Sequence, residues 1–433
     1  MPSRLSLLLL CGLLTTVRAA DHFPGLKLNE GFNATLVSKP KLAGNAVAIA
    51  FDSQNRLYTV EANRRVTGTW GVTMSRWWSM EDYAGKTLAD RQAMYDRWVH
   101  IVPPAKLTRN ADLLRRLTDT NDDGTFDQSE ILREYRAPLD GNAAGVLTHG
   151  KDIYVANAPS IWRLDEKSED ELLRGLGVRV GVYGHDLHGL VWGPDGRLYF
   201  SLGDRGFNLT SREGKHFAAP TRGAVFRCFP DGSGLELIHV GLRNPQDLAF
   251  NELGDLFTVD NDMGGVDKSR VVHVIEGGDS GWDATYQLTR NFREETKRHD
   301  HTEPPWFTEN LWQTNHPGQP LWLHPPIAYL THGPSGMEFD PGWGSPKRFR
   351  NSFYVCDFRG TANRSGIYSF HLTPDGAGYR MSGTNTFAWG ILPADIEFGW
   401  DARLYLADWI GGWGGDGERR LVRLASDENW SAA

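Results

Sequence analysis

Short hydrophobic stretches come in pairs along most of the chain, and each pair is joined by a polar turn. The clearest pair is LVWGPDGRLYFSL at residues 190–202, where two apolar segments flank the turn GPDG. Apolar segments of this length on either side of a Gly/Asp turn are typical of a β-hairpin, because Gly and Asp tolerate the backbone angles that reverse the chain. The pattern therefore predicts antiparallel strands over this region.

The same phrase recurs six times, beginning near residues 48, 145, 189, 247, 336 and 395. Further strand candidates lie between the copies, such as AVFRCF and RVVHVI, and they bring each unit to roughly four strands. Four strands form one blade of a β-propeller, and a sandwich of this length would not explain the recurrent phrase. We therefore expect an all-β fold, a single six-bladed β-propeller over residues 20–433. Its ring should span about 22–425, closed by the first and last blades.

One departure from the repeat follows the first copy. Residues from about 75 to 116 form an insertion that is helical in its later part, with Leu88, Met94, Tyr95 and Trp98 on one face. The spacing of these four residues matches the 3.6-residue period of an α-helix, so the insertion should pack this face against the rest of the protein.

Aromatic residues mark both this insertion and a second one. Trp70, Trp77 and Trp78 either stack on a sugar ring or simply pack the insertion onto the propeller. A later segment, roughly 285–330, is rich in Trp, His and Pro and has no periodicity. A structureless stretch of this length is usually functional, so we expect a long functional loop there.

The N-terminus has the composition of a secretory signal. Arg4 precedes an apolar run from Leu5 to Leu14, and small residues follow before Ala20. Residues 1–19 are therefore predicted to be a signal peptide, which implies export to the periplasm or the cell exterior. The apolar run is too short to span a bilayer, and no later segment is long enough either.

Charge and cysteine content narrow the function further. The formal net charge is −8 at pH 7 and no long basic run occurs, so nucleic-acid binding is not expected. Beyond the signal peptide the cysteines are Cys228 and Cys356, which either form one disulfide or stay as buried thiols in separate strands. The chain has no Cys-x-x-Cys-His motif, so it should carry no c-type haem of its own.

Residues 119–130, DTNDDGTFDQSE, match the twelve-residue calcium loop of an EF-hand. Gly124 stands at the tight turn that lets alternate oxygen atoms face a central ion. Because the flanks look like strands as much as helices, we expect one structural calcium that staples a hairpin; the simpler alternative is an acidic turn without an ion. The expected ligands are Asp119, Asn121, Asp123, the Thr125 carbonyl, Asp127 and Glu130.

Polar residues end the second strand of every repeat. In a propeller these strand ends converge on one face around the central channel, so six regions far apart in sequence would contribute to one rim. The alternative is that each Asp or Asn only starts its own turn. The residues concerned are Glu61, Asn157, Asp204, Asp260 with Asn261 and Asp262, Asp357, and Asp408.

Charged and imidazole side chains gather at one end of the hairpin in the third repeat. His185, Asp186 and His188 precede its first strand, and Asp204 and Arg205 follow its second. A β-hairpin does not need these groups, so they indicate a site. We expect Asp186 to cap the local turn, whereas His188 is either structural or functional.

A second local signal is GLRNPQDLAF at residues 241–250. Arg243 offers a planar cationic fork, and Asn244 offers an amide, on a turn stiffened by proline. The turn directly precedes an apolar strand, which places both side chains at the predicted rim, where they would face an anion.

In combination, GHDLHGLVWGPDGRLYFSLGD, GLRNPQDLAF and EGGDSGW resemble the soluble quinoprotein glucose dehydrogenase and glucose/sorbosone dehydrogenase family. The first repeat with EANRR, the DTNDDG loop and FRCFPDG look closer still to the propeller of the large bacterial "membrane-bound dehydrogenase" proteins. This resemblance implies a six-bladed propeller that binds pyrroloquinoline quinone (PQQ) and calcium in its channel. It implies oxidation of a carbohydrate or another alcohol, with an electron-acceptor protein as partner.

The same resemblance assigns roles to individual residues. It implies that His185 is the catalytic base, that Asp204 orients it, and that Arg243 belongs to the reacting centre. Arg359 and Arg364 are the candidates for cationic positions on the later blades. The residues expected to bind the cofactor are Asn244, Arg205, Asp260, Asn261, Asp262 and Arg359.

Two other functions use the same rim. Glu61, Asn157, Asp204, Asp260 and Asp262, with His185 and His188, could instead hold a divalent metal, as in a metal-dependent lactonase or a glycoside-active hydrolase or lyase. A non-catalytic glycan-binding propeller that grips its ligand with tryptophans is a third possibility.

Overall fold

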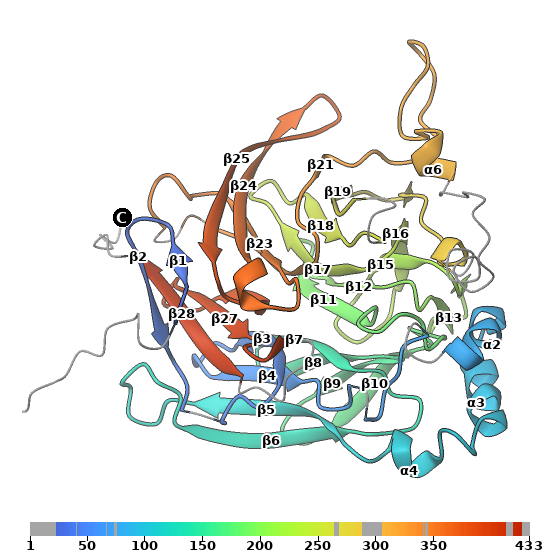
Figure 1. Cartoon of the computed structure of the whole chain (residues 1–433), viewed down its shortest axis with the longest axis horizontal. Coiled ribbons are helices and arrows are strands. Elements are labelled where there is room, and N and C mark those ends of the chain that lie inside the picture. Colours follow the sequence, from blue (N-terminus) through green and yellow to red (C-terminus); the bar gives the residue numbers. More distant parts are fainter. Residues whose placement is uncertain are drawn as a thin grey trace, which may run out of the picture.

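Six antiparallel sheets arranged around a central channel account for most of the regular structure (Figure 1). The computed structural model describes residues 23–39, 41–65, 67–72, 76–263, 268–287, 305–340, 342, 345–412 and 419–426. The first strands of successive sheets lie beside one another, and the sixth contacts the first, which closes the ring. The predicted all-β, six-bladed propeller is therefore confirmed. The expected signal peptide, residues 1–19, lies outside the described residues.

The four main strands of each blade follow one another in chain order, except in blade 6, where the ring closes. Blade 1 contains β3 (Ala46–Phe51), β4 (Leu57–Glu61), β5 (Asp112–Thr118) and β6 (Gln128–Tyr135). Blade 2 contains β7 (Ala143–His149), β8 (Asp152–Asn157), β9 (Ser160–Leu164) and β10 (Glu169–Arg174). Blade 3 contains β11 (Leu187–Trp192), β12 (Leu198–Leu202), β15 (Gly223–Cys228) and β16 (Glu236–Leu242), extended by the parallel β20 (Gly278–Asp279).

The other three blades follow the same order. Blade 4 contains β17 (Pro245–Phe250), β18 (Leu256–Asp260), β19 (Arg270–Val274) and β21 (Ala328–Tyr329). Blade 5 contains β22 (Pro334–Phe339), β23 (Phe353–Asp357), β24 (Gly366–Asp375) and β25 (Gly378–Trp389), with β1 (Lys27–Leu28) on its edge. Blade 6 contains β26 (Pro393–Phe398), β27 (Leu404–Asp408) and β28 (Arg420–Ser426), and is completed by β2 (Phe32–Leu36). Because β2 comes from the other end of the chain, its pairing with β28 fastens the ring.

The six sequence phrases form the first two strands of the six blades, and their polar turns have a shared purpose. In three blades the turn aspartate accepts a hydrogen bond from a tyrosine hydroxyl in the second strand. The pairs are Asp52 with Tyr58 at 3.1 Å, Asp195 with Tyr199 at 3.0 Å, and Asp401 with Tyr405 at 2.9 Å. Each bond ties a turn to the strand that follows it, which explains why the phrase repeats both the acid and the aromatic residue.

The helical insertion lies between β4 and β5, as predicted. It consists of η1 (Arg76–Trp78), α2 (Ser79–Ala84), α3 (Leu88–Arg97) and α4 (Pro104–Leu107). Strand β5 begins at Asp112, inside the expected end of the insertion at residue 116. Thr87 and Asp90 form a capping box that starts α3, in which the side chain of each residue accepts the backbone amide of the other.

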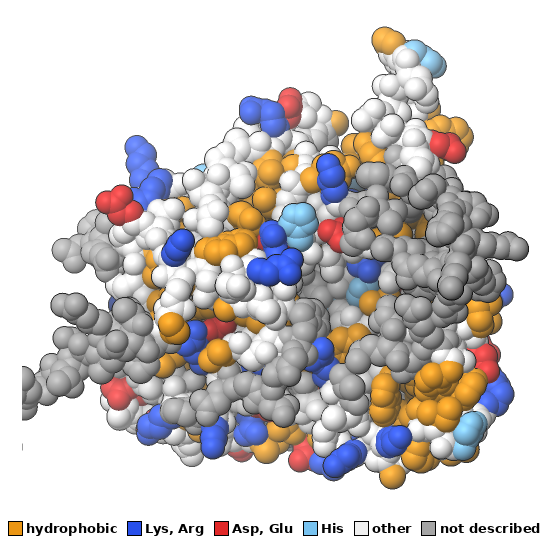
Figure 2. Space-filling view, in the orientation of Figure 1, with side chains coloured by type: hydrophobic (Ala, Val, Ile, Leu, Met, Phe, Trp, Pro, Cys, Tyr) orange, Lys and Arg blue, Asp and Glu red, His pale blue; other side chains and the backbone are white. Residues whose placement is uncertain are grey.

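The insertion packs on the propeller and is not a separate domain. Trp78, Met94, Val102 and Leu107 are buried together with Val180, which precedes blade 3. Trp77 stands 4.4 Å from Trp78 and 4.7 Å from Trp98 between ring centres, so these tryptophans pack with one another. Hydrophobic side chains also gather on the outer surface over α2 and α3 (Figure 2), with Trp77, Met80, Val99 and Ile101 exposed.

The part of the second insertion that the structure describes contains α6 (Pro305–Thr308). Trp306 of this helix is buried against Trp282, at 5.6 Å between ring centres. A short hairpin of β13 (Phe207–Thr210) and β14 (His216–Ala219) follows blade 3's second strand. Within the described ranges, none of the helices has the length and apolar character needed to cross a membrane. Cys228 in blade 3 and Cys356 in blade 5 are both buried free thiols.

Candidate functional site

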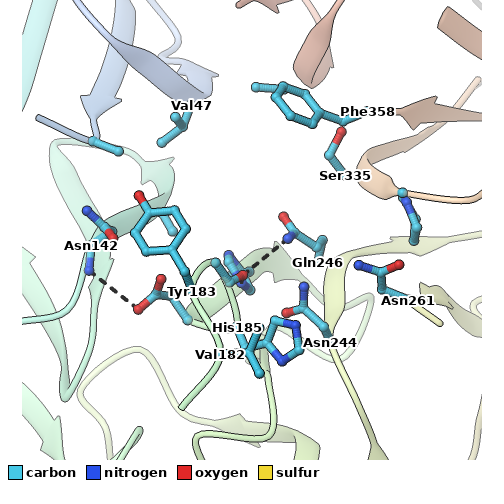
Figure 3. A pocket seen from close by; sticks show the side chains of 18 of the residues that line it. Val47, Asn142, Val182, Tyr183, His185, Asn244, Gln246, Asn261, Ser335 and Phe358 are labelled. Carbon is cyan, nitrogen blue, oxygen red and sulfur yellow. Dashed lines mark hydrogen bonds between the residues drawn. The ribbon is translucent and has the colours of Figure 1, made fainter. Parts of the chain in front are cut away.

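A pocket of about 430 Å³ opens at the centre of the ring (Figure 3). That size lies within the range of small-molecule sites, roughly 300–1,000 Å³. The first strands of the blades supply its floor, and the segments before the first strands and after the second strands supply its walls. Its polar and aromatic lining residues include Asn142, Tyr183, His185, His188, Arg243, Asn244, Gln246, Asn261, Asp262, His332, Ser335, Phe358 and Trp409.

His185 and Asp204 form a buried dyad at this cavity. Nδ1 of His185 lies 2.7 Å from Oδ1 of Asp204, and the two side chains are 4% and 1% exposed. His185 lines the cavity, whereas Asp204 stands behind it. Since Nδ1 is engaged by the carboxylate, the remaining ring nitrogen, Nε2, is the one available to a ligand.

The second carboxylate oxygen of Asp204 is also engaged. The indole Nε1–H of Trp282 donates to Oδ2 at 2.8 Å. Trp282 is fully buried, and Arg243 lies over its ring with the guanidinium carbon 5.3 Å from the ring centre. Asp204 is therefore fixed at both oxygens, which in turn fixes the ring of His185.

Burial lowers the pKa of His185 below its ordinary value; Asp204 opposes this shift and Arg243 adds to it. The ring is therefore neutral at pH 7 and able to accept a proton. Burial on its own raises the pKa of Asp204, but the charge and hydrogen bond of His185, together with Arg243 and Arg179, lower it on balance. A neutral imidazole beside an ionised carboxylate is the arrangement that general-base catalysis requires.

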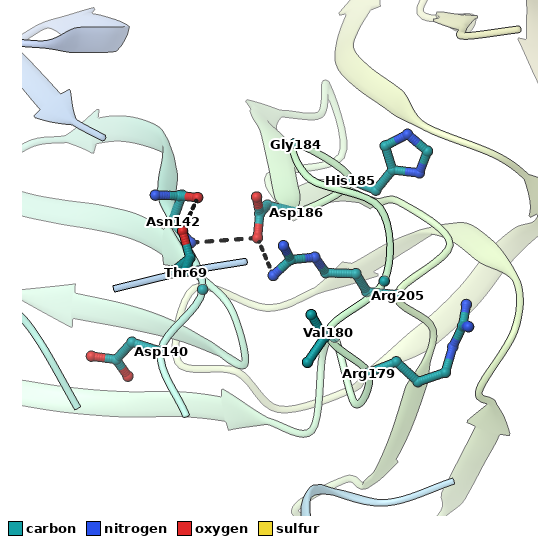
Figure 4. A network of polar contacts seen from close by, with 12 residues as sticks. Thr69, Asp140, Asn142, Arg179, Val180, Gly184, His185, Asp186 and Arg205 are labelled. Carbon is teal, nitrogen blue, oxygen red and sulfur yellow. Dashed lines mark hydrogen bonds and ion pairs between the residues drawn. The ribbon is translucent and has the colours of Figure 1, made fainter. Parts of the chain in front are cut away.

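His188 and Asp186, the other two ionisable residues next to His185, each contact another group of the protein. Nε2 of His188 lies 3.1 Å from the Gly184 carbonyl, and burial lowers the pKa of His188 to about 4, so it is a neutral histidine that supports the chain before blade 3. Asp186, expected to cap a turn, instead pairs with Arg205 at 2.7 Å (Figure 4). Arg205 is buried behind the cavity lining, although its Nε and second terminal nitrogen have no hydrogen-bond partner.

Arg243, Asn244 and Gln246 bring polar groups to one wall from the start of blade 4. Arg243 donates to Gln287 at 3.2 Å, but its Nε has no partner. The side-chain oxygen of Asn244 is also without a partner, and Asn244 is only 1% exposed. Buried polar atoms without partners are costly, so a bound ligand that satisfies them would be strongly favoured.

Gly203 allows this wall to approach His185 closely. A Cβ atom on Gly203 would lie 2.8 Å from the backbone of His185 and 2.9 Å from the Asn244 side-chain oxygen. Any larger residue would have to separate the two. The amide of Gln246, two residues after Asn244 in the same motif, donates to the Gly184 carbonyl at 3.2 Å. Gln246 was not among the predicted residues. Its position two residues after Asn244 in the same motif could have identified it as a cavity residue.

Three of the predicted rim acids brace their own blades. In blades 4, 5 and 6 one oxygen of the aspartate that ends the second strand accepts a backbone amide that precedes the first strand, and the other oxygen pairs with an arginine. The three sets are Asp260 with the Asn244 amide at 2.8 Å and Arg270 at 3.0 Å; Asp357 with the His332 amide at 3.0 Å and Arg359 at 2.5 Å; and Asp408 with the Leu392 amide at 3.0 Å and Arg420 at 2.6 Å.

This brace corrects two predicted cofactor contacts. Asp260 does not line the cavity; it holds the backbone of Arg243 and Asn244, which do. Arg359 does not line the cavity either, because Asp357 two residues earlier captures it. Asn261 and Asp262 line the cavity, and Arg364 ends the exposed helix η2 (Ala362–Arg364), outside the lining.

Blade 3 lacks the aspartate that in blades 4, 5 and 6 binds a backbone amide and an arginine. Its second strand reads LYFSL and ends in Leu202, where blades 1, 4, 5 and 6 have an acid and blade 2 has Asn157; its own acid, Asp204, stands two residues further on. The carboxylate is therefore free of the brace and holds His185. Over the part of the chain that the structure describes, no three His, Cys, Asp or Glu side chains are grouped to hold a metal.

Cations flank the opposite wall of the cavity. Arg65 from blade 1 lies over the rings of Tyr183 and Trp409, at 5.3 and 5.7 Å from the ring centres. Arg419, before the last strand of blade 6, lies 4.1 Å from the centre of the Trp409 ring. Tyr183 and Trp409 both line the cavity, so positive charge is present on two sides of it, with Arg243 on blade 4.

A second, smaller cavity continues down the channel and shares Val47, Ala144, Gln246 and Ala394 with the first. Its surroundings are acidic: Asp247, Asp395 and Glu397 line it. Burial raises the pKa of all three above the usual range, to about 7 for Asp395, and neighbouring carboxyl groups add to the shift of Asp247 and Glu397. Glu338 belongs to the same group, with its pKa raised by burial to about 8.

The predicted calcium loop joins β5 to β6 at an exposed end of blade 1. Asp119 accepts the Gly124 amide at 2.7 Å, and Asp127 accepts the Thr120 amide at 3.1 Å. Glu130 lies within β6 and pairs with Arg116 at 2.5 Å, so it does not complete a ligand shell in this arrangement. Calcium in this loop stays a prediction of the motif.

The family model described as "Domain of unknown function (DUF7133)" matches residues 19–411. The chain belongs to this family. No curated protein sequence matches the chain.

Solved structures with the same fold include sugar dehydrogenases. An oxidoreductase described as a glucose dehydrogenase, from Thermus thermophilus, is 18% identical, with 91% of this chain and 100% of that chain covered and a TM-score of 0.53. The PQQ-bound aldose sugar dehydrogenase of Streptomyces coelicolor is 16% identical, with 92% and 100% covered and a TM-score of 0.50. The PQQ domain of a Coprinopsis cinerea pyranose dehydrogenase is 12% identical, with 92% and 97% covered and a TM-score of 0.53. At these identities the likeness establishes the fold alone.

The cavity residues suit a flat acidic quinone such as PQQ. An anionic ring system needs cationic or amide donors at its edges and aromatic surfaces against its faces. Arg243 and Asn244 offer polar groups with unused hydrogen-bonding capacity, and Tyr183, Phe358 and Trp409 offer aromatic surfaces. The unpartnered Nε of Arg243 is a donor that an anion accepts, whereas the unpartnered Asn244 oxygen is an acceptor that suits a hydroxyl or N–H group of a ligand.

Proposed function

We propose that this protein is an exported oxidoreductase that oxidises a sugar or a related alcohol with a PQQ-type quinone and calcium in the propeller channel. The buried His185–Asp204 dyad at the central cavity carries this proposal, because it supplies a neutral base with a fixed orientation. The propeller fold supports it, since solved structures of that fold include PQQ-bound sugar dehydrogenases.

In this account His185 accepts the hydroxyl proton of the substrate at Nε2. Asp204 accepts the Nδ1–H of the ring and stabilises the imidazolium that forms. A bound quinone of this type supplies the two-electron acceptor that alcohol oxidation requires. Arg243 and Asn244 bind and orient the bound anion, and the aromatic residues at the cavity exclude water from it.

Calcium in the channel belongs to the same proposal. Asn261 and Asp262 line the cavity beside Met263 and provide amide and carboxylate oxygens, the ligand type that calcium prefers. Electrons would leave to a separate acceptor protein, because this chain has no haem-attachment motif.

A dye-linked assay with a panel of sugars, in the presence of PQQ and calcium, tests the proposal. His185→Ala should lower turnover by roughly 10²- to 10⁴-fold, the usual contribution of a general base, while the fold stays intact. His216→Ala is the matched control, because His216 lies exposed on the β13–β14 hairpin and should leave turnover unchanged. Metal-dependent hydrolysis of a lactone or glycoside without dye reduction would overturn the oxidoreductase assignment.

A further inference from the structure

The loop of residues 177–184 leads from β10 directly into His185 and carries Tyr183, which lines the cavity. On one side the loop bonds the segment after β12. The Gly177 amide donates to the Gly206 carbonyl at 2.7 Å, and the Arg179 amide donates to the Arg205 carbonyl at 3.1 Å. On its other side the loop meets the helical insertion of blade 1.

Asp82 of α2 binds the middle of this loop. Its two carboxylate oxygens accept the backbone amides of Val180 at 2.6 Å and of Gly181 at 3.0 Å. Asp82 is 2% exposed, so water does not replace these bonds. In return, the Gly181 carbonyl accepts the Val72 amide at 2.9 Å, just before the insertion.

Arg91 of α3 binds the same loop from a second helix. One terminal nitrogen donates to the carbonyl oxygens of Gly177 at 3.1 Å and Arg179 at 3.3 Å, and the other donates to the Leu139 carbonyl. Arg91 is 4% exposed, and the Val180 side chain packs into the apolar core of the insertion. The backbone amides and carbonyls of the loop thus form hydrogen bonds with side chains of the insertion and with the segment after β12.

The loop in turn holds the backbone of Asp204. Arg179 is 1% exposed and donates from Nε to the Pro220 carbonyl at 2.7 Å and from a terminal nitrogen to the Asp204 carbonyl. Figure 4 shows Arg179 and Val180 beside the Asp186–Arg205 pair, in the loop that ends at His185. A shift of this loop would therefore displace both members of the dyad.

We infer that the helical insertion is a positioning element for the His185–Asp204 dyad, and that Asp82 and Arg91 are its positioning residues. The physical claim is that these two side chains fix residues 177–184. Its catalytic consequence rests on the function proposed above. Neither residue touches the cavity, so they act through the loop and not on substrate.

Hydrogen–deuterium exchange tests the physical claim without an activity. Asp82→Asn keeps the size of the side chain but leaves one acceptor for two amides, so exchange in residues 177–184 should rise roughly ten-fold while β11 and β12 stay protected. Asp90→Asn is the matched control, because it weakens the capping box of α3 without contacting the loop. Unchanged exchange in Asp82→Asn, or an equal rise in Asp90→Asn, would overturn the inference.

Kinetics then separate positioning from stability. In the dye-linked assay Asp82→Asn and Arg91→Met should lower kcat by on the order of ten- to a hundred-fold with little change in KM, since a misplaced base slows the reaction without weakening binding. Arg91→Lys should recover part of kcat. A loss confined to the melting temperature, with kcat unchanged, would contradict positioning. If the wild type oxidises no sugar, the proposed function fails, and the exchange result still decides the inference.

Discussion

Trp282 donates its indole N–H to Oδ2 of Asp204 at 2.8 Å, the carboxylate oxygen that His185 does not use. The bond ties a residue after blade 4's third strand to an acid in blade 3, and Trp306 of the second insertion packs behind it. The orientation of the dyad is therefore set by three parts of the chain that are far apart in sequence.

Trp282→Phe should lower kcat by roughly ten-fold or more while the protein stays folded. The phenyl ring fills most of the space, but Asp204 loses a buried hydrogen-bond donor, and an unsatisfied buried acceptor costs about 1–3 kcal/mol. Steady-state kinetics and thermal unfolding measure the two effects. Trp322→Phe is a suitable control, because Trp322 is 77% exposed. Equal kinetics for Trp282→Phe and wild type would show that this bond does not support the dyad.

The pH profile of kcat/KM should have an acidic limb below pH 6.5. Burial lowers the pKa of His185, and the base works only when neutral, so the rate falls as pH drops through that pKa by about ten-fold per pH unit. Asp204 opposes the shift, so Asp204→Asn should move the limb to still lower pH and reduce the plateau. A limb above pH 7, or a profile without one, would contradict His185 as the base.

The acidic channel predicts that stability falls as pH rises. Burial raises the pKa of Glu338 to about 8 and that of Asp395 to about 7, whereas unfolded carboxyl groups titrate near pH 4. The folded state therefore binds more protons than the unfolded state between about pH 4 and 8, and the free energy of unfolding decreases across that window.

Glu338→Gln removes one of the carboxyl groups that bind a proton in the folded state but not in the unfolded state. Its melting temperature should exceed that of the wild type at pH 8, and the difference should vanish toward pH 5, where Glu338 is already neutral. Glu134→Gln, on the exposed edge of blade 1, should show no such trend. A difference that is the same at every pH would argue against a raised pKa for Glu338.

The loop at residues 119–130 predicts a calcium-dependent stability. Asp119→Ala should lower the melting temperature in calcium-containing buffer and have a smaller effect with a chelator present. Asp165→Ala removes a comparable turn, in which Asp165 accepts two backbone amides, and should act equally in both buffers. If Asp119→Ala also acts equally in both, its role is the turn and not an ion.

The repeat made the architecture predictable, because each copy contains its own strands and its own polar turn. In three blades a tyrosine hydroxyl in the second strand donates a hydrogen bond to the aspartate of that turn. The same repetition misled the assignment of rim residues. An acid that recurs in blade after blade serves the blade, as Asp357 and Asp408 do, and the departure in blade 3 marks the site. Arg359 was misassigned for this reason, since the nearby Asp357 holds it.

Contacts between residues far apart in the chain could not be predicted from short sequence patterns. His185 and Asp204 flank one hairpin, so their pairing could be predicted from the turn between them. Trp282 reaches Asp204 from 78 residues later in the chain, and Asp82 reaches Val180 from a helix almost a hundred residues earlier. Such contacts depend on how the ring closes, which no short segment specifies.

Equilibrium titration of the purified protein with PQQ, with and without calcium, tests the central claim most directly. The account predicts saturable binding with a change in quinone absorbance. It also predicts weaker binding in Arg243→Gln and unchanged binding in Arg212→Gln, which alters an exposed arginine on the β13–β14 turn. The absence of any absorbance change at saturating quinone, or equal binding by both variants, would contradict the account.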